Sequence, residues 1–197
     1  MVRSRPPRRI GIFGGTFDPP HIGHLVAATE ARTALDLDVV LMVVANEPWQ
    51  KVGTRPLSPA EDRLALVEAA VAGAEGLEVS DLELRRGGSS YTADTVADVA
   101  AAEPDAELFV ILGRDAAAGF ATWERYEDVA AAATLVVVDR PGPPVELDGR
   151  FAWQRVDIPE LELSSTELRE RVAAGRSIRY LTTDGVASVI EERGLYR

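Results

Sequence analysis

The chain of 197 residues contains no cysteine and only two histidines, two methionines and one lysine. Without cysteine it can form no disulfide bond, no zinc–thiolate site and no thiolate nucleophile. Apolar residues make up 46% of the sequence and charged residues 27%, which is typical of a globular domain long enough to bury a full core. The sites of chemistry must therefore be sought among oxygen and nitrogen groups.

The sequence also lacks an apolar run long enough to cross a bilayer. The first nine residues are basic, but only a short strand-like run follows them, which is not the pattern of a signal peptide. We therefore expect a cytoplasmic protein without a membrane partner. The sequence leaves the formation of a homo-oligomer open.

Positive charge is in short supply, because the net charge is −11. A surface of this sign disfavours long nucleic acids, so we expect no nucleic-acid partner, whereas small anions need only a few local cations. Of the 21 basic residues, 20 are arginine, and the single lysine is Lys51. Lysine and arginine are not interchangeable at a point-charge contact, so Lys51 is a weak candidate for function beside the simpler reading of a solvated loop residue.

Short apolar segments alternate with helical patterns along the whole chain. We predict strands at 8–13, 38–44, 77–80, 107–113 and 134–138, and helices at 22–35, 58–73, 93–102, 123–132, 164–174 and 184–193. This alternation predicts an α/β fold, a Rossmann-like doubly wound parallel sheet with helices on both faces. We expect one domain over 1–197, with disorder at 1–8, no clear pattern at 143–157, and a helical C-terminal part at 164–197.

A pair of glycines follows the first predicted strand. Gly14 and Gly15 lack side chains, so the backbone there can pass close to a ligand. The amides of Gly15, Thr16 and Phe17 can then point at phosphate oxygens. In α/β proteins, the turn from a strand into a helix is where phosphates are held.

Both histidines of the chain come directly after this turn, where the next helix begins. His21 and His24 are three residues apart, so their imidazoles project from one face of the first helical turn. Two imidazole donors beside open amides favour a site that stabilises charge on a phosphoryl group in transition. Taken without the glycines, the two histidines would be ordinary residues of a helix start.

Other phosphate-binding and metal-binding motifs fit this segment less well. The Gly-Lys-Ser/Thr ending of a Walker loop and the Gly-x-Gly-x-x-Gly of dinucleotide-binding proteins are both absent. A zinc site would need further ligands, and the chain has no cysteine and no third histidine. Phosphate binding is the better interpretation.

A second candidate phosphate site opens the helix predicted at 164–174. Ser164 and Glu167 have the spacing of a capping box, which is common before helices and needs no ligand. That explanation leaves Ser165, Thr166 and Arg169 without a role. Two hydroxyls, open amides and an arginine one turn later could together hold a polyphosphate.

Both segments resemble one superfamily. The run Gly-Gly-Thr-Phe-Asp-Pro-Pro-His-Ile-Gly-His over 14–24 resembles the ATP-binding motif of the nucleotidylyltransferases, built on His-x-Gly-His. The run Ser-Ser-Thr-Glu-Leu-Arg over 164–169 resembles their second motif, which grips the β- and γ-phosphates. Class I aminoacyl-tRNA synthetases share the first motif, but they would carry a lysine-rich loop in place of the second.

Within that superfamily the chain is most similar to the nicotinate mononucleotide adenylyltransferase family, over about residues 9–197. The segments that match in order are 45–51, 58–69, 84–95, 112–115, 120–126 and 177–197. Many members have Pro-Pro-His-Lys where this chain has Pro48-Trp49-Gln50-Lys51, and 143–157 does not align clearly. The resemblance implies one nucleotidylyltransferase domain that joins the phosphate of nicotinate mononucleotide to the AMP part of ATP.

The resemblance also implies roles for individual residues. For ATP they are Gly14, Gly15, Thr16, Phe17, His21, His24, Gly113, Asp115, Ser165, Thr166 and Arg169. For the mononucleotide they are Asn46, Lys51, Tyr91, Thr92, Trp123 and Glu124. The catalytic group is His21, His24, Lys51 and Arg169. Magnesium is expected with ATP, mostly ligated by water. Asp18 and Asp115 are candidate ligands for it, but each could equally well bind a ribose.

Two alternatives remain open at this point. Another small nucleotidylyltransferase, such as one that acts on phosphopantetheine, would share both phosphate motifs but would not need the flat pocket implied by Tyr91, Thr92 and Trp123. A catalytically silent nucleotide sensor would not need His21 and His24. Each pocket residue alone also has a plain explanation, since tryptophan is more often a core residue.

Overall fold

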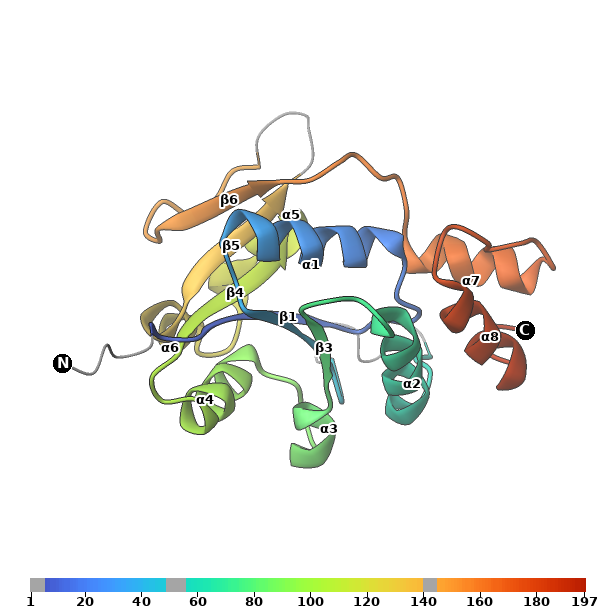
Figure 1. Ribbon diagram of the computed structural model, residues 1–197, viewed down its shortest axis with the longest axis horizontal. Helices are drawn as coiled ribbons and strands as arrows, with labels where there is room; N and C mark the ends of the chain where they lie inside the picture. Colours follow the sequence, from blue (N-terminus) through green and yellow to red (C-terminus); the bar gives the residue numbers. More distant parts are fainter. Residues whose placement is uncertain (1–5, 49–55, 140–144) are drawn as a thin grey trace.

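The computed structural model describes residues 6–48, 56–139 and 145–197. A six-stranded sheet lies at its centre in the order β3-β2-β1-β4-β5-β6, and every pair of neighbours is parallel (Figure 1). The strands are β1 (Arg9–Gly15), β2 (Val39–Val44), β3 (Leu77–Ser80), β4 (Glu107–Gly113), β5 (Thr134–Asp139) and β6 (Trp153–Asp157). This is the strand order of a doubly wound Rossmann-like sheet, so the predicted fold class is confirmed.

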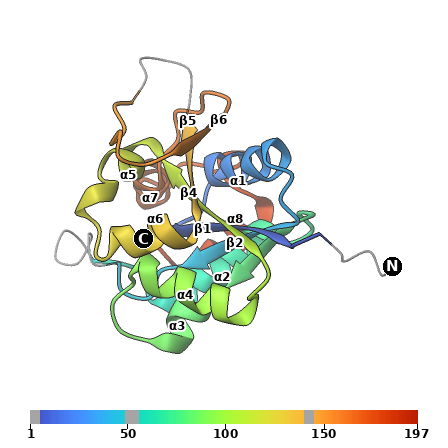
Figure 2. The same cartoon turned by 90° about the vertical axis from the view of Figure 1, so that its left-hand side faces the viewer.

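Helices cover both faces of the sheet, as Figures 1 and 2 show for α1 and α4. They are α1 (Ile22–Ala34), α2 (Ala60–Val71), α3 (Leu82–Arg86), α4 (Thr92–Ala102), α5 (Arg114–Ala118), α6 (Tyr126–Ala132), α7 (Ser165–Ala173) and α8 (Asp184–Glu192), with a 3-10 helix at Phe120–Thr122. Side chains alternate along β1: Ile10 and Ile12 pack in the cluster under α4, and Phe13 packs in the cluster under α1. Coverage of both faces explains why β4 is buried at each position from 108 to 112.

The C-terminal part does not lie on the sheet. Helices α7 and α8 pack against α2 through a separate apolar cluster that contains Leu66, Leu168, Val186 and Ile190. This cluster brings residues 164–197 beside the turn that follows β1. No helix within the described ranges is both long and apolar enough to cross a bilayer.

Several parts of the chain differ from the sequence prediction, and α3 and α5 lie where no helix was predicted. β6 lies in the stretch where no pattern was readable, because it is an edge strand in which only Val156 is buried. Trp123 was predicted at the start of a helix over 123–132, and this was wrong. Arg125 has a left-handed backbone (φ 51°), so α6 begins at Tyr126 and Trp123 stands in the loop before it.

The strand order fixes where a ligand can bind. Chain connections run to opposite faces of the sheet from β1 and β4, which are neighbours, so a crevice opens at their carboxyl ends. β1 ends at Gly15 and β4 ends at Gly113. The first candidate phosphate turn therefore lies at the topological switch point.

Candidate active site

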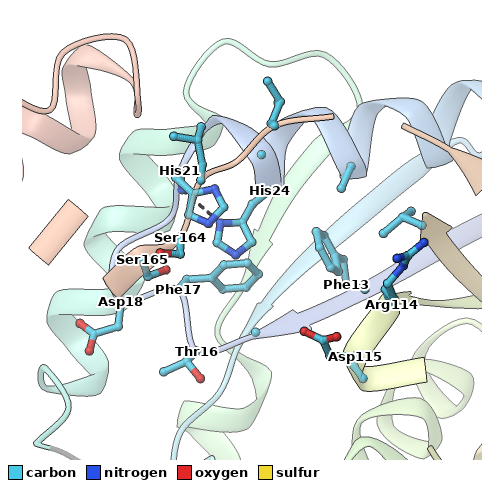
Figure 3. A pocket seen from close by; sticks show the side chains of 18 of the residues that line it. Phe13, Thr16, Phe17, Asp18, His21, His24, Arg114, Asp115, Ser164 and Ser165 are labelled. Atoms are coloured by element: carbon cyan, nitrogen blue, oxygen red, sulfur yellow. Dashed lines mark hydrogen bonds between the residues drawn. The ribbon is translucent and has the colours of Figure 1, made fainter. Parts of the chain in front are cut away.

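The glycine turn after β1 is shaped by a phenylalanine. Phe17 has a left-handed backbone (φ 49°), and its ring folds back over the strand end. A Cβ atom on Gly15 would lie 2.6 Å from the Phe17 ring, so glycine is required there by close approach. Figure 3 shows this ring between Thr16 and the two histidines.

The two histidines are brought together as the sequence predicts. Their ring centroids are 3.8 Å apart, and the Phe17 ring meets His24 edge-on at 5.1 Å (Figure 3). The backbone N–H of His21 donates to Nδ1 of His24 at 3.1 Å. Because Nδ1 is the acceptor, the proton of the neutral imidazole sits on Nε2, and His24 presents an N–H donor there.

His21 is the more buried of the pair, with 9% of its surface exposed. Burial lowers its pKa from 6.5 to about 4, because desolvation disfavours the charged ring. Its Nδ1 atom is buried without a hydrogen-bond partner. A buried nitrogen without a partner costs stability, and a ligand that hydrogen-bonds to it would recover that cost.

This shift makes a prediction about stability. Between pH 6.5 and about 4 the unfolded chain binds a proton at His21 that the folded chain does not, so stability falls as the pH is lowered through that window. The loss is on the order of 3 kcal/mol, from 1.36 kcal/mol per pKa unit. Urea denaturation of wild type and His21→Asn at several pH values measures it. The free energy of unfolding of wild type minus that of His21→Asn should fall as the pH is lowered towards 4. A difference that stays constant with pH would contradict the prediction.

The second motif docks against the first. Ser164 caps α7 by accepting the N–H of Glu167 at 3.1 Å, as predicted. Ser165 Oγ donates to the carbonyl of Pro19 at 2.8 Å, and Arg169 donates to the carbonyl of Asp18 at 2.8 Å.

Two further contacts from the C-terminal part hold the same turn. The Thr182 hydroxyl donates to the carbonyl of Pro20 at 2.9 Å, and the Tyr196 hydroxyl donates to the carboxylate of Asp18 at 2.7 Å. Burial and the neighbouring Asp18 charge both raise the pKa of Tyr196, so this hydroxyl stays protonated. The turn that carries the histidines is thus fastened by the C-terminal part at three successive residues.

A cavity of about 770 Å³ opens beside the histidines. All eleven residues of the predicted ATP site line it: Gly14, Gly15, Thr16, Phe17, His21, His24, Gly113, Asp115, Ser165, Thr166 and Arg169. Another wall is the segment between β6 and α7, where Ile158, Pro159, Leu161 and Leu163 line the cavity. The sequence analysis missed this wall; apolar residues spaced through a polar loop were the available signal.

A second cavity of about 500 Å³ adjoins the first. Both are lined by Gly14, Gly15, Thr16, Gly113 and Asp115, so they meet over the glycine turn. Of the residues predicted to bind the mononucleotide, Thr92 and Trp123 line this second cavity. Asn46, Tyr91 and Glu124 flank it without lining it, and Lys51 lies outside the described residues.

Trp123 packs on one side against the core. Its ring lies 5.7 Å from that of Phe120, which also contacts Tyr126, Phe151 and Trp153. The residue therefore serves as a core aromatic and as a wall of the second cavity. The core contacts fix the ring, which is what a stacking surface requires.

The start of α4 forms another part of the wall of the second cavity. Tyr91 is its N-cap residue and makes no side-chain capping bond, so the positive end of the helix dipole is turned to the cavity at Thr92. Arg125 pairs with Asp94 at 2.6 Å and holds the loop of Trp123 against this helix.

A buried carboxylate that the sequence analysis missed supports the same helix. Glu83 is 6% exposed and accepts the Thr95 hydroxyl at 2.5 Å, which ties α3 to the first turn of α4. Its Oε2 atom has no partner, and both Glu83 and Thr95 line the second cavity.

Asn46 contributes to the site through its backbone and its amide. The side-chain nitrogen donates to the carbonyl of Gly88 at 2.8 Å, and the next residue, Glu47, accepts the N–H of Ser90 at 3.0 Å. The loop after β2 is thereby fastened to the loop before α4. The predicted phosphate contact of Asn46 stays a prediction.

A resident metal site is not built into the described ranges, where no three histidine or carboxylate side chains form a metal-binding group. Asp115 is nevertheless placed where both cavities meet. Asp18 is 1% exposed and bonded to Tyr196. Asp115 is therefore the better placed of the two for a ribose or a metal that arrives with a ligand.

The chain is similar to relatives that share one description. Residues 12–171 match the cytidylyltransferase-like family. The chain is 47% identical over 189 residues to a "probable nicotinate-nucleotide adenylyltransferase" of Thermus thermophilus, covering 96% of this chain and all of the relative. It is 46% identical to a protein of the same description from Frankia casuarinae, covering 94% and 98% of the two chains.

Solved structures share the fold. The Plasmodium falciparum nicotinic acid mononucleotide adenylyltransferase complexed with NaAD superposes with a TM-score of 0.78 and 17% identity, over 96% of this chain and 97% of the other. The crystal structure of a "putative nicotinate-nucleotide adenylyltransferase" from Vibrio parahaemolyticus superposes with a TM-score of 0.71 and 23% identity, over 96% of both chains.

Proposed function

Since this chain belongs to the nicotinate-nucleotide adenylyltransferases, within the cytidylyltransferase-like family, we propose that it transfers the adenylyl group of ATP to nicotinate mononucleotide. The products are nicotinate adenine dinucleotide and pyrophosphate, a step of NAD biosynthesis. The observation that carries the proposal is the pair of cavities that meet over Gly14, Gly15 and Thr16. ATP occupies the larger cavity and the mononucleotide the smaller one, so their reacting phosphates meet above the turn.

The reaction is a direct displacement. A phosphate oxygen of the mononucleotide forms a bond to the α-phosphorus of ATP, and the bond from that phosphorus to the β-phosphate oxygen breaks. Pyrophosphate leaves with the electron pair of that bond. No covalent enzyme intermediate is required, so the protein acts by positioning and by stabilising charge.

The histidines act on the α-phosphoryl oxygens. Nε2–H of His24 donates to an oxygen whose negative charge grows in the transition state, and the His21 ring lies beside it, tilted by 32° with the ring centroids 3.8 Å apart. The amides of the glycine turn supply further donors.

The second motif holds the leaving group. Ser165, Thr166 and Arg169 line the larger cavity, and we assign them to the β- and γ-phosphates. A guanidinium carries five N–H donors, so Arg169 can bind phosphate while keeping its contact to the Asp18 carbonyl. Lys51 and Asn46 are assigned to the mononucleotide phosphate on the resemblance alone.

We propose that magnesium arrives with ATP, ligated by phosphate oxygens and water. It would offset charge on the triphosphate, and Asp115 is the protein carboxylate placed to assist. Cytoplasmic localisation stays a prediction from the sequence, which leaves the formation of a homo-oligomer open.

The test is formation of pyrophosphate from ATP and magnesium with a panel of acceptors. We expect product with nicotinate mononucleotide and little or none with phosphopantetheine. Turnover should stop when EDTA removes magnesium. Activity with phosphopantetheine alone would favour the second nucleotidylyltransferase reading, and nucleotide binding without pyrophosphate for any acceptor would favour the sensor.

A further inference from the structure

One arginine lies beneath the point where the two cavities meet. Arg63 belongs to α2 and is 1% exposed, which makes it the largest fully buried side chain within the described ranges. Within the described part of the chain, its guanidinium donates to the backbone carbonyls of four residues. They are those of Ser58 at 3.0 Å, Thr16 at 3.1 Å, Ala45 at 2.5 Å and Asn46 at 2.9 Å. These carbonyls come from the start of α2, the glycine turn and the loop after β2.

These contacts also determine the direction of the N–H groups that follow the bound carbonyls. In a trans peptide, the carbonyl of one residue and the N–H of the next point in opposite directions. A Thr16 carbonyl held by Arg63 therefore turns the N–H of Phe17 away from Arg63, and an Ala45 carbonyl does the same to the N–H of Asn46. Thr16 and Phe17 line the larger cavity, and Thr16 and Ala45 line the smaller one.

We infer that Arg63 is a positioning residue that aims the amides of these turns at the phosphates of both substrates. The substrates in this inference are those of the proposed adenylyl transfer, and its geometry comes from the carbonyl contacts of Arg63. Donors that are fixed in advance stabilise developing charge without reorganising during the reaction. A substrate bound between two loops also depends on how those loops are spaced, and Arg63 spans both.

The turn needs such a support. Phe17 holds a left-handed backbone (φ 49°), a conformation that residues other than glycine adopt only when their surroundings impose it. The Arg63 bond to the Thr16 carbonyl is the contact immediately before that residue. Arginine suits this position because its planar fork reaches several carbonyls at once, which the single ammonium of lysine does not.

Arg63→Lys tests the inference, because it keeps the charge and loses the fork. We expect kcat to fall about tenfold and the KM values of both ATP and the mononucleotide to rise. Val67→Ala is the matched control, since Val67 lies one turn further along α2 at 0% exposure in the apolar cluster. It should lower Tm and leave kcat and both KM values near wild type at a temperature where each variant is folded. A purely structural Arg63 would give Arg63→Lys the same pattern as Val67→Ala, and that result overturns the inference.

Wild-type protein supplies a second measurement that needs no variant to fold. In ¹H–¹⁵N spectra, the amide resonances of Phe17 and Asn46 should shift when α,β-methylene ATP and then nicotinate mononucleotide are added. In Arg63→Lys these shifts should shrink. Unshifted Phe17 and Asn46 amides in a wild-type protein that binds the analogue overturn the inference. Shifted amides in a protein that forms no pyrophosphate would instead leave the inference standing and remove the proposed reaction.

Discussion

Replacing His24 with alanine is expected to lower kcat by about a hundredfold or more, with much smaller changes in the two KM values. The Nδ1 atom of His24 is occupied by the N–H of His21, so the ring is fixed with Nε2–H as donor. Such a donor stabilises charge that develops mainly in the transition state, so its removal affects turnover more than binding. Steady-state rates of pyrophosphate formation measure this.

The control lies on the same helix. Thr33 is exposed near the far end of α1, and Thr33→Ala should keep wild-type kcat. Circular dichroism and Tm establish that both variants are folded. A folded His24→Ala protein with near-normal kcat would remove the histidine from the mechanism.

Local signals explain the parts of the site that the sequence predicts. Gly15 is identifiable because two adjacent glycines follow a predicted strand, and His21 and His24 because helical spacing places them on one face. The Ser164 cap depends on residues only three apart. Each of these features is decided within one turn of chain, so a pattern in the sequence is enough to locate it.

Contacts between distant segments explain the parts that the sequence does not predict. Arg63 and Thr16 are 47 residues apart in the sequence, and no sequence motif predicts that the Arg63 guanidinium donates to the Thr16 carbonyl. Glu83 belongs to no motif in the sequence, yet it is buried against Thr95. The docking of Ser165 on Pro19 spans 146 residues and depends on how α7 packs on α2. Only the assembled fold determines these contacts.

The edge strand β6 and the start of α6 were not predicted correctly, each for its own reason. β6 has one buried side chain, Val156, so its sequence shows no period-two alternation. Trp123 lies at the first position of the helix that the sequence predicts over 123–132, although the structure begins α6 at Tyr126. The left-handed Arg125, held by Asp94, shows that tertiary contacts decide this boundary.

Preference for the acid over the amide substrate is the second large effect that we expect. Nicotinate mononucleotide carries a carboxylate where nicotinamide mononucleotide carries a neutral amide. At the uncapped start of α4, the helix dipole and the first amides favour an anion, and Thr92 places them on the cavity wall. The NH₂ of the amide substrate would face these donors, at a cost on the order of 1–3 kcal/mol for each mispaired group. We expect kcat/KM to favour the acid by roughly tenfold to several hundredfold.

Trp123→Ala locates this preference in the smaller cavity. Because Trp123 lines that cavity and is absent from the larger one, the substitution should raise the KM of the mononucleotide more than that of ATP. Trp153→Ala is the matched control: Trp153 also packs against Phe120, at 5.5 Å, but does not line the smaller cavity. If Trp123 acts only as a core residue, both variants will lose Tm and neither will change the ratio of the two KM values. Equal kcat/KM values for the acid and the amide in wild type would contradict a carboxylate site at the start of α4. A preference for the acid that survives Trp123→Ala would assign that preference to the helix amides alone.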